Sequence, residues 1–229
     1  MLGILGGIAP GSTIDYYRAI VAAWRDRVRD GSYPAIVINS IDLKRMLDLV
    51  AAGDLGALAD YLVAEMGRLE RAGAEVGLMA SNTPHLVFDQ VRARSALPLL
   101  SIVEATRDAA RDRSLRRVGL IGTRFTMEGC FYPEVFARAG IEVRVPEAGE
   151  QAEIHDRYVA ELVSGVFRDE TRQRVLAIAH RLVDRDGIEA LILGGTELPL
   201  LLRGAPEPGV PFLDTTKIHV ERAVAAMIE

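Results

Sequence analysis

The chain has 229 residues, enough for one large domain or two small ones, and 49% of them are hydrophobic, which is ample for a packed core. A net charge of −5 without a basic run argues against nucleic acid as a partner, and no apolar stretch is long enough to span a membrane. One cysteine, four histidines without zinc spacing and no basic-led signal peptide predict a cytoplasmic protein without a disulfide or a bound metal.

The first half of the chain alternates short apolar runs with amphipathic segments, which predicts strands and helices in turn. A buried strand at residues 2–5 leads into a glycine-rich loop, after which Ser12 or Thr13 is expected to cap a helix running to about Arg29. Further strands are predicted at 35–39, 76–79 and 99–101, and further helices at 43–52, 55–72 and 86–94. Asp54 is expected to cap the 55–72 helix, whose core stripe is Leu55, Leu58, Leu62, Met66 and Leu69.

The second half shows the same alternation. Strands are predicted at 117–121, 141–145, 190–193 and 210–213, and helices at 102–113, 152–163, 170–185 and from Thr215 or Thr216 to near Ile228. Because strands and helices alternate throughout, the sheets should be parallel and covered by helices on both faces.

Two pairs of strand ends recur at nearly equal spacing. From Gly6 to Ser81 is 75 positions (81 − 6), and from Gly122 to Gly195 is 73 (195 − 122). Any α/β chain repeats strand–loop–helix units, but here both the order of elements and their spacing agree, so we interpret the pattern as an internal duplication. The expected lobes are residues 1–102 plus 215–229, and residues 103–214.

Small polar loops follow these strands, at the edge where open parallel sheets bind ligands. The first loop, GGIAPG at 6–11, lacks the lysine of a nucleotide-binding P-loop. Its backbone N–H groups and the helix start suit an anion such as a carboxylate.

Five segments resemble, in the same order, motifs of the aspartate/glutamate racemase superfamily of cofactor-independent amino-acid racemases. They are GGIAPGST at 6–13, SNTPH at 81–85, GTRFTM at 122–127 with FY at 131–132, GGTE at 194–197, and DT at 214–215 with His219. The resemblance covers essentially the whole chain. It implies two pseudo-symmetric parallel-sheet lobes with the active-site cleft between them, no cofactor, a small amino-acid or carboxylate substrate, and a homodimer.

In that family two cysteines act on opposite faces of the substrate α-carbon, one removing a proton and the other delivering one. Here Ser81 stands at the first cysteine position and Gly195 at the second. A serine hydroxyl is too weak an acid to serve as a resting base without an activating partner, and glycine leaves an empty space. The resemblance therefore implies an altered mechanism, with negligible α-proton exchange on ordinary aspartate or glutamate.

Four residues, Ser81 among them, are candidates for the proton transfer that the two absent thiols would carry out. Cys130 is either a relocated acid/base or, as is more common for a lone cysteine, a small hydrophobe on the inner face of a helix. His85 either activates Ser81 or orients its loop. Glu197 either acts as a general acid/base or bonds backbone amides of its own loop.

Several further residues are expected to bind substrate through hydroxyls or backbone N–H groups, a role compatible with loop capping. They are Gly7, Pro10, Asn82, Thr83, Gly122, Thr123, Thr126, Gly195 and Thr196. Lys44 and Arg45 either reach a second carboxylate or are simply solvated.

Three functions stay open at this point. The first is a racemase or epimerase of altered mechanism. The second is a divergent lyase, decarboxylase, isomerase or cyclase that uses an enolate-stabilising pocket in the same cleft. The third is a catalytically inactive carboxylate-binding homologue.

Overall fold

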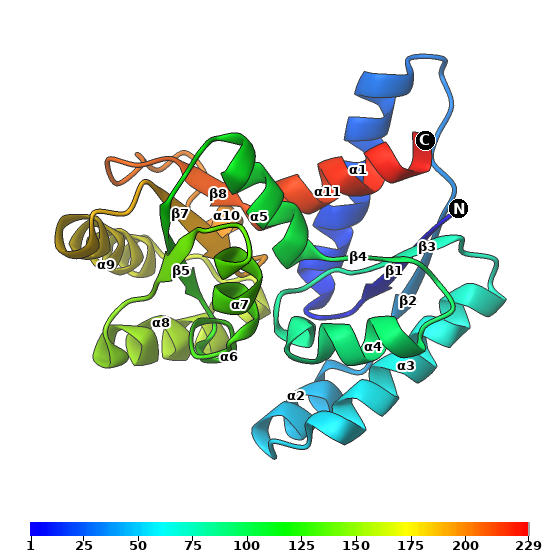
Figure 1. The fold of residues 1–229 in the computed structure, drawn as a ribbon, viewed down its shortest axis with the longest axis horizontal. Coiled ribbons are helices and arrows are strands. Elements are labelled where there is room, and N and C mark those ends of the chain that lie inside the picture. Colours follow the sequence, from blue (N-terminus) through cyan, green and yellow to red (C-terminus); the bar gives the residue numbers. More distant parts are fainter. Residues whose placement is uncertain (229) are drawn as a thin grey trace. The chain divides into compact units, whose positions relative to one another are not determined.

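The computed structural model describes residues 1–228, and its internal contacts divide the chain into two compact units (Figure 1). Unit 1 is Met1–Ile102 together with the residues from His219 onward, and unit 2 is Val103–Ile218. The second boundary lies inside the last helix, four residues after the expected position at 215 (219 − 215). The Thr215 hydroxyl donates to the carbonyl of Leu193 at 2.8 Å, which ties the start of that helix to unit 2.

Unit 1 contains a four-stranded parallel sheet in the order β2-β1-β3-β4. Its strands are β1 (Leu2–Gly6), β2 (Ile36–Ser40), β3 (Val76–Met79) and β4 (Leu99–Leu100). Its helices are α1 (Pro10–Val28), α2 (Leu43–Ala51), α3 (Leu55–Arg71), a 3₁₀ turn at Thr83–Val87 and α4 (Phe88–Arg94). Since Leu5 pairs with both Asn39 and Met79, the carboxyl ends of β1, β2 and β3 lie at one edge of the sheet.

Helices cover both faces of this sheet. On one face, α1 lies beside the last helix, α11 (Thr215–Ile228), as Figure 1 shows. A core cluster joins them to the strands: Leu2, Ile4, Tyr16, Ile20, Leu78, Ala80, Val220, Ala223 and Val224. On the other face, Leu69 of α3 packs closely against Gly3. The last helix therefore packs on the first sheet.

Unit 2 repeats the plan with the order β6-β5-β7-β8. Its strands are β5 (Arg117–Gly122), β6 (Glu142–Arg144), β7 (Ala190–Gly194) and β8 (Phe212–Asp214). Its helices are α5 (Ile102–Asp112), α6 (Arg124–Met127), α7 (Phe131–Ala137), α8 (Ala148–Ala160), a 3₁₀ turn at Leu162–Ser164, α9 (Asp169–Asp186) and α10 (Leu198–Leu201). Side chains of α8 and α9, including Ile154, Tyr158 and Val175, form one core cluster with Leu191 and Leu193 of β7. Both sheets are parallel, as predicted. Among the residues that the structure describes, no helix is long and apolar enough to cross a membrane.

Two local predictions were wrong. Helix α1 begins at Pro10 with Ala9 as its N-cap, because a proline needs no N–H partner in the first turn. Ser12 instead donates from inside that turn to the carbonyl of Ala9 at 2.8 Å. Leu55 is 39% exposed, since it opens α3 beyond the edge of the core, whereas Asp54 caps that helix as expected by accepting from the N–H of Ala57.

Candidate active site

The loop after β1 is held in a tight backbone turn. Gly7 has φ +86°, and its N–H donates to the Thr13 hydroxyl at 2.8 Å. A Cβ at this position would lie 2.6 Å from the carbonyl oxygen of Ile41. Both the backbone conformation and the lack of space therefore require glycine at position 7. The loop ends at Pro10, which is exposed at the start of α1.

Gly7→Ala is expected to lower the free energy of unfolding of unit 1 by about 2–4 kcal/mol, because left-handed strain adds to a backbone clash. Gly31→Ala is the matched control, since Gly31 has φ +84° and no atom lies within 4 Å of the place that a Cβ would take. The control should cost only about 1 kcal/mol. Denaturant unfolding of both variants measures the difference, and equal costs would contradict the steric argument.

The loop after β3 places three polar residues at the carboxyl edge of the first sheet. Ser81, Asn82 and Thr83 are each at most 7% exposed, and the 3₁₀ turn begins directly after Asn82. Within residues 1–228 the Ser81 hydroxyl has no side-chain base bonded to it. Unit 1 therefore presents a serine hydroxyl at the first thiol position without an activating partner.

Both ring nitrogens of His85 form hydrogen bonds with backbone groups. Its Nε2 accepts from the N–H of Ile102 at 3.3 Å, so Nδ1 carries the proton and donates to the carbonyl of Ser81 at 3.1 Å. Burial lowers the pKa of His85 to about 3, and its ring stacks on Phe88. With both nitrogens engaged, the geometry assigns His85 to orienting the loop and leaves no nitrogen for the Ser81 hydroxyl.

The loop after β5 is the counterpart in unit 2. Thr123 is the N-cap of α6, and its hydroxyl lies 3.2 Å from that of the fully buried Thr126. A Cβ at Gly122 would lie 2.6 Å from the carbonyl oxygen of Gly194, so β5 and β7 approach closely where both strands end. Thr123 and Thr126 thus lie beside the loop that carries Gly195.

Gly195 does not border an empty space, and that expectation was wrong. The backbone of Gly195 is not among the positive-φ positions, so its conformation accepts a side chain. A Cβ built there would lie 2.6 Å from both the hydroxyl oxygen and Cε2 of Tyr158. The phenol of Tyr158, from α8, therefore fills the volume in which a residue-195 side chain would begin.

Tyr158 belongs to a buried polar cluster at the carboxyl end of β7. Its hydroxyl donates a short hydrogen bond to Oε2 of Glu197 and accepts from the N–H of Glu197 at 3.4 Å. The Thr196 hydroxyl donates to the same carboxylate oxygen at 2.9 Å. Burial, with the neighbouring Glu197 carboxylate, raises the pKa of Tyr158 well above its ordinary value.

Sequence reasoning missed Tyr158 altogether. It lies on the buried side of α8 with Ile154, next to Leu162 of the following 3₁₀ turn, a pattern typical of core. Its partner Glu197 is 39 positions away, so no local motif connects the two residues. The glycine at a position where the family has a side chain was the one available hint that another residue fills that space.

The remaining candidates lie outside these clusters. Cys130 is exposed at the N-cap of α7, so the interpretation as an inward-facing hydrophobe was wrong. Lys44 pairs with Asp48 at 2.6 Å. The Arg45 guanidinium lies over the Tyr61 ring at 4.3 Å.

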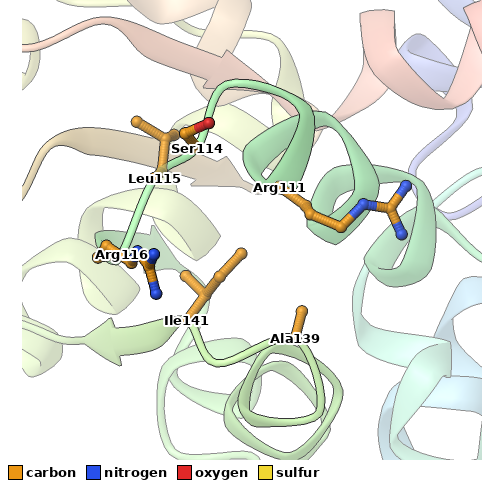
Figure 2. A pocket seen from close by; sticks show the side chains of 6 residues that line it. All are labelled: Arg111, Ser114, Leu115, Arg116, Ala139 and Ile141. Carbon is orange, nitrogen blue, oxygen red and sulfur yellow. The ribbon is translucent and has the colours of Figure 1, made fainter.

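A hollow of about 210 Å³ lies at the other end of the second sheet (Figure 2). Its lining residues are Arg111, Ser114, Leu115, Arg116, Ala139 and Ile141. They precede β5 and β6 in the chain, so the hollow is at the amino ends of these strands. Ligands of open parallel sheets bind at the carboxyl ends, where Gly122 and Gly195 lie, and the hollow is therefore not part of the candidate site.

Comparison with known proteins agrees with the geometry. Residues 5–223 match the family model for Asp/Glu/Hydantoin racemase. The chain is 23% identical over 237 residues to the broad specificity amino-acid racemase RacX of Bacillus subtilis, covering 100% of this chain and 98% of that protein. It is 27% identical over 154 residues to a glutamate racemase of Aquifex aeolicus, covering 65% of this chain but only 57% of that enzyme.

Among solved structures, an aspartate racemase homologue from Pyrococcus horikoshii OT3 superposes with a TM-score of 0.84 at 32% identity. The superposition covers 100% of this chain and 99% of that one. The two-sheet architecture, the five motifs and the family match agree over nearly the whole sequence. The chain therefore belongs to the Asp/Glu/Hydantoin racemase family.

Proposed function

We propose that the chain is an isomerase-type enzyme that transfers a proton at the α-carbon of a small amino acid or related carboxylic acid, without a pair of thiols. The observation that carries the proposal is the pair of strand-end loops, which keep the family's polar residues although Ser81 and Gly195 replace both cysteines. The names of the relatives, which include a broad specificity amino-acid racemase and a glutamate racemase, support an amino-acid substrate. Cofactor independence and a homodimer belong to the same proposal.

Binding of the substrate carboxylate is assigned to the hydroxyls and backbone N–H groups of these loops. Asn82 and Thr83 follow β3, and Thr123, Thr126 and Thr196 lie at the ends of β5 and β7. The cations considered for a second carboxylate have other partners, since Lys44 pairs with Asp48 and Arg45 with Tyr61. We therefore expect the substrate to carry one carboxylate, and aspartate and glutamate to react poorly.

Proton NMR in heavy water tests the proposal. The purified protein is incubated separately with both enantiomers of small neutral amino acids and of aspartate and glutamate, and loss of the α-proton resonance is followed. The expected result is exchange of at least one neutral amino acid at least tenfold faster than aspartate or glutamate. Absence of exchange from the whole panel would overturn the proposed function.

The relocated-thiol hypothesis gives a separate prediction for Cys130. If its thiol transfers the proton, Cys130→Ser lowers turnover, while the melting temperature stays nearly unchanged because the side chain is exposed. Alkylation with iodoacetamide should then inactivate the wild type and have no further effect on the variant. Full exchange in Cys130→Ser removes this residue from the catalytic candidates.

A further inference from the structure

We propose that the phenol of Tyr158, paired with the carboxylate of Glu197, replaces the second family thiol as the proton-transfer group of unit 2. This inference rests on the proposed function and names the residues that carry it out. The main observation is that the Tyr158 hydroxyl oxygen lies 2.6 Å from the position that a Cβ of residue 195 would take. A phenol hydroxyl thus occupies the place in which a cysteine side chain at position 195 would begin.

The chemistry of the cluster favours this role over simple packing. Tyr158 and Glu197 are 4% and 5% exposed, and a carboxylate is costly to bury unless hydrogen bonds compensate for lost water. A phenylalanine at 158 with an apolar residue at 197 would fill the same core at no such cost. The chain instead keeps a phenol and a carboxylate in direct contact, together with the Thr196 hydroxyl.

The pair can accept and return one proton with all charges balanced. In the resting state it holds a neutral phenol and a carboxylate. When the substrate Cα–H bond breaks, its electrons remain on the substrate as a carbanion and its proton adds to the phenol oxygen. The original phenol proton moves at the same time to Oε2 of Glu197. The reverse sequence returns a proton to the carbon, so the pair serves in turn as base and as acid.

Two other tyrosines, both fully buried, do not have this arrangement. The Tyr16 hydroxyl lies 3.0 Å from Nδ1 of His219 in unit 1, and the Tyr132 hydroxyl bonds Thr106 in unit 2. No strand-end glycine has either ring in the place of its side chain. Tyr132 is nevertheless fully buried and hydrogen-bonded, which makes it a matched control for loss of a tyrosine hydroxyl.

The experiment measures α-proton exchange in heavy water, over the amino-acid panel described above, for wild type, Tyr158→Phe, Glu197→Gln and Tyr132→Phe. Tyr158→Phe keeps the ring in the core but removes the transferable proton, and we expect exchange to fall roughly 10²–10⁴-fold. Glu197→Gln keeps an acceptor for the Tyr158 hydroxyl but cannot hold a proton, and a similar loss is expected in kcat rather than in KM. In Tyr132→Phe, the α-proton of the substrate should exchange at the wild-type rate. The melting temperature of this variant should change about as much as that of Tyr158→Phe.

The outcomes separate the two claims. Exchange retained in Tyr158→Phe or in Glu197→Gln overturns the inference and leaves the proposed function standing. Exchange absent already from the wild type overturns the proposed function, and the inference falls with it. Exchange lost in both variants, with Tyr132→Phe normal, supports both claims.

Discussion

Restoring both family thiols, as Ser81→Cys with Gly195→Cys, is expected to leave the interconversion of amino-acid enantiomers no faster than in the wild type. The reason is steric, because the new Cβ would lie 2.6 Å from two atoms of Tyr158, closer than nonbonded atoms approach. Tyr158 sits in a packed core with Ile154 and Leu162 and cannot move away freely. We expect Gly195→Cys alone to lower the free energy of unfolding by about 1–3 kcal/mol through overpacking.

Adding Tyr158→Val to the two cysteines should remove the clash and raise the rate of enantiomer interconversion by roughly 10²-fold or more, since a thiol then stands at each of the two family positions. The matched control is Ser81→Cys with Tyr158→Val, which has the same opened space but no thiol at 195 and should stay inactive. Chiral chromatography of each reaction measures the rates. A faster interconversion in the double-cysteine variant that still carries Tyr158 would contradict the steric argument. It would show that the phenol ring moves aside to make room for the new side chain.

The fold was predictable because its information is local. Apolar runs of strand length end at or just before Gly6, Ser81, Gly122 and Gly195, and a polar loop follows each of them. This pattern predicts parallel strands and places the loops at the carboxyl edge of each sheet. The errors are also local and concern helix starts. A proline at position 10 opens α1 earlier than the hydroxyls of Ser12 and Thr13 suggest, because those hydroxyls bond the preceding turn from inside the helix.

The candidate site was only half predictable, because its unusual part is a contact between distant segments. The sequence motifs locate Gly195 and Glu197, but the residue that fills the space beside the glycine comes from the apolar stripe of α8. His85 shows the same limit. Its spacing from Ser81 is compatible with activating the hydroxyl, and only the N–H of Ile102, which comes from another segment, fixes the ring tautomer and excludes that role.

Acidification is expected to destabilise unit 1 between pH 6.5 and 4, because two buried histidines are neutral in the folded state. His219 accepts from the Tyr16 hydroxyl at Nδ1 and donates from Nε2 to the carbonyl of Leu100, and burial lowers its pKa to about 4. The pKa of His85 is lowered to about 3 by burial, with nearby His219 and Arg92 contributing in the same direction. Both values lie below the ordinary pKa of about 6.5 that the unfolded chain retains.

The unfolded chain therefore binds more protons than the folded chain throughout this window, so stability is full above pH 6.5 and falls as the pH is lowered. At about 1.4 kcal/mol per pH unit for each group, the two histidines together should cost about 4 kcal/mol at pH 5. Guanidinium unfolding at pH 5, 6 and 7 measures the slope. His219→Gln, which keeps a donor for the Leu100 carbonyl, should reduce that slope by about half, whereas His180→Gln, at an exposed position of α9, should leave it unchanged. An equal slope in the wild type and in His219→Gln would show that the acid sensitivity comes from carboxylates instead of from the buried imidazole that anchors α11 to the first sheet.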